Sequence, residues 1–291
     1  MNSLSLKMQT YSRLIDRLEA LLDRAEALLP AARQEPDWRV HAFRWRQPGF
    51  LQAVRHPHRL RLDDLLNIER QKTTLVQNTR QFVAGRTANN ALLSGSRGTG
   101  KSSLVKAILT EFAEEGLRLI EVDKQDLIDL PEIVDPLYDR PERFIIFTDD
   151  LSFEANEPGY KALKAILDGS IAATPDNVLI YATSNRRHLM PEYMHENLEA
   201  KNIGGEIHHG EAVEEKISLS ERFGLWLAFH PFNQEQYLNT VFHWLARLKA
   251  PPTPPDTVRT EALRWALQRG SRSGRIAYQF ARDLTGRVAC R

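Results

Sequence analysis

The sequence predicts an α/β fold: a five-stranded parallel sheet between helices, with a C-terminal helical lid and an N-terminal helical extension. Three observations support this. Short apolar runs alternate with segments of helical periodicity over residues 62–231, as in a sheet with crossover helices. A glycine-rich loop, Gly95–Ser102, lies between one such run and the next helix. From residue 232 onward only helical periodicity remains, so we expect an extension at 1–61, a core at 62–231 and a lid at 232–291.

Composition limits the classes of protein that the chain can represent. It has 291 residues, 42% of them hydrophobic, and a formal net charge of +1, which excludes a strongly basic protein. The single cysteine, Cys290, cannot form an internal disulfide, which favours a reducing compartment. The N-terminus lacks the apolar segment of a secretion signal, and nowhere do 18 apolar residues run together. We therefore expect a cytoplasmic protein without a membrane partner.

The N-terminal extension combines an amphipathic helix with a basic, aromatic segment. Apolar residues recur at helical spacing over residues 10–29 until Pro30 ends the pattern. Residues 33–61 then interleave arginines with Trp38, Phe43, Trp45 and Phe50. Such a segment can bind nucleic acid by pairing with phosphates and stacking on bases. It can equally hold the extension against an oppositely charged body, and we favour this because residues 1–62 have 11 basic and 6 acidic side chains.

The helical pattern of Leu62–Phe82 leads into an apolar strand, Ala91–Leu93, and then into the glycine-rich loop. The loop fits G-x-x-x-x-G-K-[ST] at every fixed position, and a helix ending at Gly116 follows it. Glycines let such a loop curl until its N–H groups point at phosphate oxygens, beside the positive end of the next helix. We expect Lys101 to contact the β and γ phosphates and the Ser102 hydroxyl to bind Mg²⁺. The predicted phosphate-binding residues are Gly95, Ser96, Arg97, Gly98, Thr99, Gly100, Lys101, Ser102 and Ser103.

Two later strands end in polar side chains. After a second strand at 117–122, the apolar run 143–148 ends in Asp149 and Asp150, where ligands bind in open α/β sheets. Asp149 is the candidate Mg²⁺ partner and Asp150 the candidate for orienting the attacking water. The alternative, an acidic turn that caps the next helix, is less favoured because a phosphate loop precedes the pair. The strand at 177–185 ends in Asn185, which can hydrogen-bond the γ phosphate or the water.

The C-terminal part contains an insert, a fifth strand and helices. Residues 186–217 are expected to form an exposed insert, and His208 and His209 lack the partners of a metal site. Arg222 precedes the fifth strand at 225–230. Helical patterns then begin at Asn233 and continue beyond the proline-rich segment 251–255, around 258–269 and 273–285.

Together these residues resemble the motifs of AAA+ ATPases over residues 62–291. Gly95–Ser102 resembles Walker A, Phe144–Asp150 Walker B and Asn185 sensor 1, while Arg222 resembles an arginine finger and Arg275 sensor 2. The segments 89–93, 149–154 and 182–189 further resemble bacterial AAA+ proteins of domain-of-unknown-function family 815, and the likeness extends into 43–46. The resemblance implies binding of ATP and Mg²⁺, hydrolysis to ADP and phosphate, and a homo-oligomer that forms a ring or assembles with nucleotide.

Two features depart from the general AAA+ pattern. The acidic residue that polarises water is usually Glu, whereas Asp150 is one methylene shorter, so we expect slow hydrolysis or a contribution from Glu154. The segment after the second strand, residues 123–128, lacks the aromatic-apolar-Gly signature of loops that thread polypeptides. We therefore do not expect protein unfolding by threading.

Three functional hypotheses follow. The leading one is an ATPase that couples nucleotide state to motion of the lid and of subunits on an unidentified protein client. The second is an ATP-binding scaffold with negligible turnover, and the third is a DNA-associated loader or remodeller. Only the basic, aromatic segment supports the third, so nucleic acid is not the favoured partner.

Overall fold

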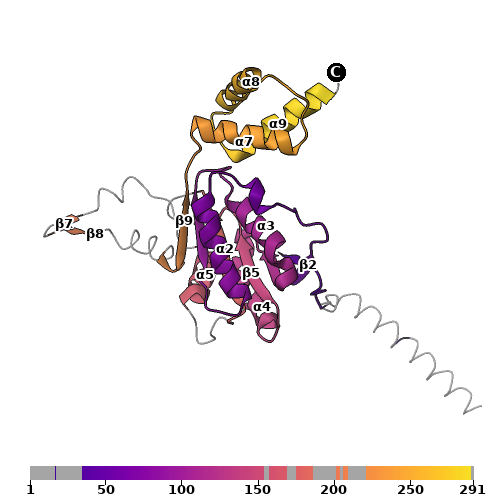
Figure 1. Cartoon of the computed structure of the whole chain (residues 1–291). Coiled ribbons are helices and arrows are strands. Elements are labelled where there is room, and N and C mark those ends of the chain that lie inside the picture. The colour runs from indigo at the N-terminus through magenta and orange to yellow at the C-terminus, as the bar shows by residue number, and fades with distance from the viewer. Residues whose placement is uncertain are drawn as a thin grey trace, which may run out of the picture. The chain divides into compact units, whose positions relative to one another are not determined.

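The computed structural model describes residue 17 and residues 35–153, 157–168, 175–185, 201–203, 206–208 and 221–289 (Figure 1). The chain divides into two units, Met1–Asp37 and Trp38–Arg291, and the second contains the elements discussed below. The expected helix at 10–29 lies outside the described residues except for Arg17, as do Cys290, Glu154 and most of the 186–217 insert. Within the residues that the structure describes, no helix has the length and apolarity needed to span a bilayer.

In the described part of the chain the central sheet has seven strands in the order β2-β1-β4-β5-β6-β3-β9, so the prediction of five strands is wrong. All neighbouring strands are parallel except β1 and β2, which form an antiparallel hairpin. The strands are β1 (Ala42–Arg46), β2 (Phe50–Ala53), β3 (Ala91–Gly95), β4 (Leu117–Glu121), β5 (Arg143–Thr148), β6 (Val178–Ser184) and β9 (Leu225–Phe229). A separate hairpin, β7 (Lys201–Ile203) with β8 (Glu206–His208), lies within the expected insert.

The two additional strands come from the segment that we assigned to a helical, basic extension. In β1, Phe43 and Trp45 are buried while Arg44 and Arg46 alternate with them, the two-residue period of a strand. Arg44 pairs with Glu121 on β4 at 2.5 Å, and Trp45 Nε1 donates to Asp129 at 2.9 Å. These contacts agree with the interpretation that arginines hold this segment against acidic groups of the body.

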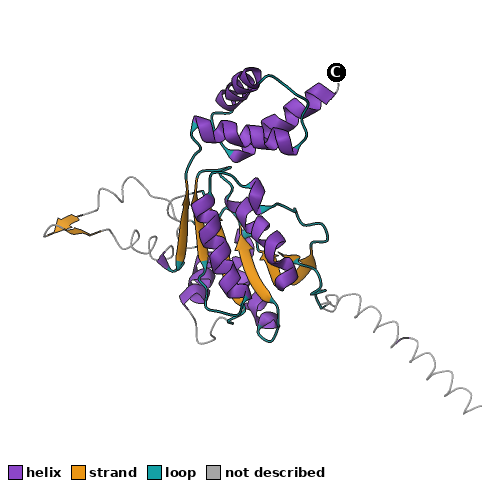
Figure 2. Cartoon of the chain, in the orientation of Figure 1, coloured by secondary structure: helices purple, strands orange, loops and turns teal. Residues whose placement is uncertain are grey.

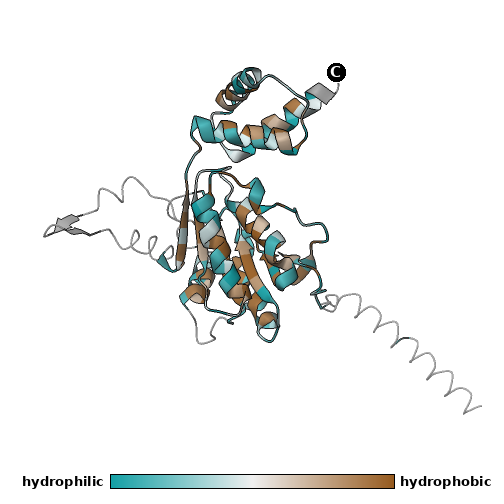
Figure 3. Ribbon diagram, viewed as in Figure 1, coloured by the Kyte–Doolittle hydropathy of each residue, from teal (hydrophilic) through white to brown (hydrophobic). Residues whose placement is uncertain are grey.

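Helices cover both faces of the sheet (Figure 2). The helices α2 (Glu69–Val83) and α3 (Lys101–Phe112) pack on one face, where their apolar residues join those of the strands in one hydrophobic cluster. The helices α4 (Leu130–Val134) and α5 (Pro158–Asp168) belong to a second cluster on the other face. Consecutive strand residues such as Ile146 and Phe147 enter opposite clusters, which explains the continuous apolar runs (Figure 3).

The short 3₁₀ helices lie mainly between these elements: η1 (Leu62–Asp64), η2 (Ala113–Glu115), η3 (Lys124–Asp129) and η4 (Asp135–Leu137). Helical structure in the expected 62–82 segment is therefore divided into η1 and α2. Asn67, between them, has φ +64°, a conformation that asparagine tolerates better than most residues.

The lid consists of α7 (Gln234–Arg247), α8 (Pro255–Gln268) and α9 (Gly274–Ala289), with a hydrophobic cluster of its own. Asn233 caps α7 reciprocally with Gln236, so this helix begins where the sequence predicts. Hydrogen bonds connect the lid to the α/β core. Among them, Arg247 Nε donates to Asp64, Asn67 Nδ2 donates to Thr240, and the N–H of Arg275 donates to the carbonyl of Gly98.

Candidate nucleotide-binding site

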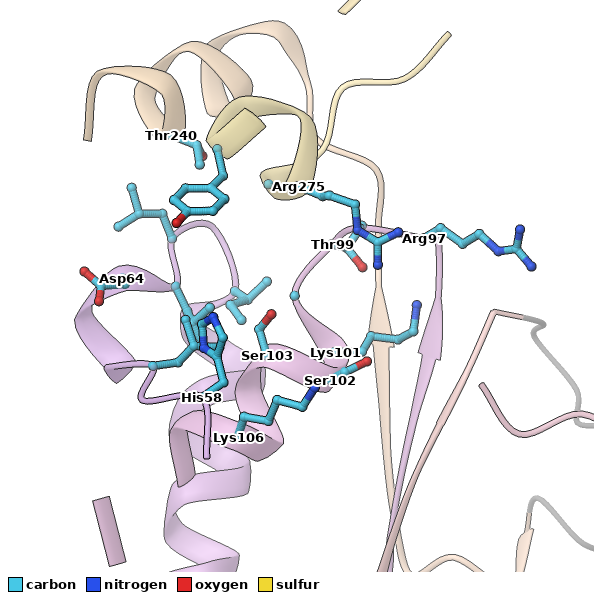
Figure 4. A pocket seen from close by; sticks show the side chains of 18 of the residues that line it. His58, Asp64, Arg97, Thr99, Lys101, Ser102, Ser103, Lys106, Thr240 and Arg275 are labelled. Atoms are coloured by element: carbon cyan, nitrogen blue, oxygen red, sulfur yellow. The ribbon is translucent and has the colours of Figure 1, made fainter. Parts of the chain in front are cut away.

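A cleft of about 780 Å³ lies where the phosphate loop, the ends of β5 and β6, and the lid meet (Figure 4). Segment 58–68 lines it from the α/β core, and residues of α7 and α9 line it from the lid. This is the carboxyl edge of the parallel sheet, where crossover connections leave room for a ligand. Figure 4 shows Lys101, Ser102 and Ser103 at the start of α3, with Arg275 approaching from the lid.

The backbone of the loop has the glycine-dependent conformation that the sequence predicts. Gly95, Gly98 and Gly100 have φ values of +132°, +76° and +104°. At Gly95 a Cβ atom would lie 2.0 Å from the carbonyl oxygen of Phe229, so a larger residue cannot fit without moving β9. Since α3 begins at Lys101, the N–H groups of its first turn have no partner within the helix and can bind an anion.

Lys101 is held at the centre of the site by three hydrogen bonds. Its Nζ donates to the carbonyls of Gly95 at 2.7 Å and Ser96 at 2.9 Å, and to Asn185 Oδ1 at 3.0 Å. Burial lowers the pKa of Lys101, and the Arg275 and Arg97 guanidinium groups lower it further, although Asp149 and Asp150 oppose them. An anionic ligand would stabilise the charged ammonium, so the site fits a phosphate chain.

Asp149 and Ser102 form the candidate Mg²⁺ site. The Ser102 hydroxyl donates to Asp149 Oδ1 at 2.6 Å, which brings a hydroxyl and a carboxylate oxygen together as the sequence predicts. Mg²⁺ prefers oxygen ligands and usually keeps few protein ligands besides phosphates and water. Among the described residues no three His, Cys, Asp or Glu side chains cluster as a metal site would require. The residues present thus fit Mg²⁺ that is held jointly with a bound nucleotide.

Asp150 lies beside Asn185 in an unusual backbone conformation. Its φ is +54°, and Asn185 Nδ2 donates to its Oδ1 at 2.5 Å. Because Asn185 also accepts from Lys101, this amide connects the Asp150 carboxylate to the Lys101 ammonium. Arg97 Nη2 lies 3.8 Å from Asp150 Oδ2, but both side chains are more than half exposed, so water screens this pair.

An ion pair between a buried carboxylate and a half-exposed arginine joins the lid to the core beside the cleft. Asp64 is 8% exposed and accepts from Arg247 Nε at 2.9 Å, while His243 Nε2 lies 3.5 Å from Asp64 Oδ1. Burial alone would raise the pKa of Asp64, but the hydrogen bonds and charge of Arg247, with a smaller contribution from nearby His243, outweigh it and lower the pKa. Asp64 therefore stays ionised at neutral pH and keeps α7 beside η1.

Apolar side chains also line the cleft. Leu65, Leu66 and Ile68 come from the segment just before α2. The lid lines the cleft with three aromatic residues that the sequence did not single out, Phe232, Trp244 and Tyr278. Helical periodicity shows that α7 and α9 are amphipathic, but it cannot say which of their residues face a cleft at the edge of the lid core.

Comparison with known proteins identifies the family. A family model described as "Protein of unknown function (DUF815)" matches residues 38–288, most of the chain. The chain belongs to this family. No curated protein matches the DUF815 chain.

Several solved structures of one bacterial protein are similar to the structure of this DUF815 protein. A lysine-to-arginine point mutant of Thermotoga maritima RuvB is similar with a TM-score of 0.51 and 15% identity, over 79% of this chain and 66% of that one. An alanine-to-serine mutant of the same protein gives a TM-score of 0.50 and 17% identity over 76% and 63%. T. maritima RuvB described as a Holliday junction branch migration motor gives 0.49 and 16%, and the chain spans 63% of its length. At 15–17% identity the likeness shows a shared fold and nothing beyond it.

Not every predicted site residue of the DUF815 protein lies in the cleft. Arg97 to Ser103, Asp149, Asp150, Asn185 and Arg275 line it, whereas Gly95 and Ser96 do not, although their carbonyls accept from Lys101 Nζ. Arg222 is not among the lining residues, and its Nε donates to Asp168 at the end of α5.

Proposed function

We propose that this protein binds ATP with Mg²⁺ in the cleft and hydrolyses it to ADP and phosphate. The observation that carries the proposal is the convergence of Lys101, Ser102, Asp149, Asp150 and Asn185 at one end of the cleft. Three separate elements supply these groups: the start of α3, the end of β5 and the end of β6. Together they offer a cation for phosphate oxygens, two oxygens for Mg²⁺ and a carboxylate for a water molecule.

Each residue has a distinct part in the proposed reaction. Lys101 and the first-turn amides of α3 bind the phosphate oxygens and balance their charge. Ser102 and Asp149 would hold Mg²⁺, which neutralises charge on the β and γ phosphates. Asp150 accepts a proton from the attacking water, or orients that water, while Asn185 holds the Asp150 carboxylate in place. Arg275 contacts the γ phosphate from the lid, so that cleavage changes the contact between lid and core.

We further propose that the protein acts as a homo-oligomer on a protein client. Arg222 lies outside its own cleft, so it can assist hydrolysis only at the site of a neighbouring copy. A DNA partner is less favoured because Arg44 pairs with Glu121, and Arg46 lies 3.7 Å from Asp123.

The test of the proposed function is ATP binding by Lys101→Ala. Loss of its charge-assisted hydrogen bonds, each worth about 1.5–3 kcal/mol, should weaken ATP binding about tenfold or more in calorimetry. Lys161→Ala is the matched control, because this lysine is exposed on α5 and does not line the cleft. Equal ATP affinity of Lys101→Ala and the parent would contradict the assignment of the loop. Phosphate release by the parent then separates the two hypotheses that share this binding site, because a scaffold binds ATP without turnover.

A further inference from the structure

Thr183 is a buried residue of the cleft that has no role in the reaction proposed above. It lies near the end of β6, is 1% exposed, and lines the cleft beside Asp149 and Asp150. Its hydroxyl donates to Asp149 Oδ1 at 2.5 Å and accepts from the N–H of Asp150 at 2.9 Å. Its carbonyl accepts from the N–H of Leu151 at 2.6 Å. One residue therefore bonds three consecutive residues of the neighbouring turn.

This turn needs such support because of the backbone at Asp150. Its φ of +54° is in the left-handed region, which side chains other than glycine adopt only at a cost. A strained conformation persists only when surrounding contacts determine it, and the bonds to Thr183 lie on both sides of the Asp150 Cα.

The same hydroxyl also orients the Asp149 carboxylate. Asp149 Oδ1 receives two donors, from Thr183 and from Ser102 at 2.6 Å. A hydroxyl can donate one hydrogen bond while it accepts another, which suits it to join a carboxylate and a backbone amide. Neither valine nor alanine could make either bond.

We propose that Thr183 is the positioning residue that fixes where the carboxylates of Asp149 and Asp150 lie, and thereby sets the Mg²⁺ affinity of the nucleotide complex. The inference rests on the proposed ATP site, but it concerns metal binding rather than turnover. Groups that hydrogen-bond a metal-ligating carboxylate commonly contribute about 10- to 100-fold to metal affinity.

The experiment compares Thr183→Val with Thr183→Ser. Binding of a non-hydrolysable ATP analogue is measured by calorimetry in EDTA and over a series of Mg²⁺ concentrations. For Thr183→Val we expect unchanged affinity in EDTA and a roughly 10- to 100-fold rise in the Mg²⁺ concentration needed for half-maximal tightening. Thr183→Ser keeps the hydroxyl and should behave like the parent.

Thr79→Val is the control for loss of a buried hydroxyl. Thr79 is fully buried and does not line the cleft. Its hydroxyl donates to the Leu75 carbonyl and is hydrogen-bonded to the hydroxyl of Tyr181, which lies on β6 as Thr183 does. Thr79→Val should therefore leave the Mg²⁺ dependence unchanged. Parent-like Mg²⁺ dependence in Thr183→Val, or an equal defect in Thr79→Val, would overturn the inference and leave the ATP site intact. A parent that binds no nucleotide would overturn the proposed function as well.

Discussion

At the scale of single residues, the conformation of Asp150 gives a physical reason for an aspartate at this position. With φ at +54°, the residue must tolerate the left-handed region, in which aspartate and asparagine occur several times more often than other non-glycine residues. A glutamate would have a longer reach, but it would fit this backbone less well. The shorter side chain then meets Asn185, whose amide fixes one carboxylate oxygen.

This reasoning predicts the behaviour of Asp150→Asn. Asparagine accepts the same backbone conformation and keeps an oxygen for Asn185, so binding of ATP and Mg²⁺ should remain as in the parent. Turnover should fall by about 100-fold or more, because an amide cannot accept a proton from water. Steady-state phosphate release and calorimetry measure the two effects separately. Unchanged turnover would transfer the role to Glu154, outside the described residues, or indicate a contaminating activity in a scaffold.

At the scale of secondary structure elements, the β1–β2 hairpin extends the sheet beyond the strands that line the site. Trp45 is 3% exposed in the core on one face, and its Nε1 donates to Asp129 in η3. Gln47 Nε2 donates to Asp126 at 3.2 Å and to Asp129 at 2.7 Å. The hairpin thus holds η3, the segment after β4. This segment includes most of residues 123–128, which lack the signature of a polypeptide-threading loop.

We predict that Trp45→Ala destabilises the fold more than it changes any affinity for DNA. Loss of a packed tryptophan should lower the free energy of unfolding by about 3–5 kcal/mol, measured by denaturant titration. Trp45→Phe is the matched variant: it keeps most of the packing, loses only the bond to Asp129, and should cost less. The contrary result has two parts. The parent would bind DNA tightly, with an affinity that falls steeply as salt rises, and the double variant Arg44→Ala with Arg46→Ala would lose this binding at an unchanged melting temperature.

At the scale of the whole molecule, Arg222 lies outside the cleft of its own chain. Its Nε donates to Asp168, and its side chain is about one quarter exposed. Ion pairs near the protein surface contribute about 1 kcal/mol or less, so a neighbouring nucleotide could replace Asp168 as the partner of the guanidinium. Arginine fingers accelerate phosphoryl transfer by about 10³- to 10⁵-fold.

We therefore predict that ATP hydrolysis requires assembly. Specific activity should rise with protein concentration, and Arg222→Ala should bind ATP normally but turn it over very slowly. Mixing Arg222→Ala with Lys101→Ala should restore part of the activity, because one subunit supplies an intact loop and the other an intact Arg222. Asp168→Ala serves as the control for the intrachain pair and should remain active. Activity that is independent of concentration, with no recovery on mixing, would assign Arg222 to the surface of its own chain.

The sequence by itself determined the phosphate loop, the two carboxylates after β5 and the placement of Asn185. These signals are local: the loop needs its glycines, Lys101 and Ser102 within eight consecutive residues, between a strand and a helix. The five strands from β3 to β9 in the main sheet could be read from apolar runs, which are continuous in β3, β5 and β6 because these central strands are buried on both faces.

The tertiary structure alone decided which distant residues meet. The hairpin joins β4 across more than 70 residues, and the hydroxyl of Thr183 reaches a turn 33 and 34 residues earlier in the chain. Asp64 pairs with Arg247 across 183 residues. Such pairings depend on strand order and on how the lid packs. A single threonine or arginine belongs to no sequence pattern from which its hydrogen-bond partner could be predicted. The physical reason is that composition and periodicity encode which face of an element is buried, whereas hydrogen-bond partners follow from three-dimensional register.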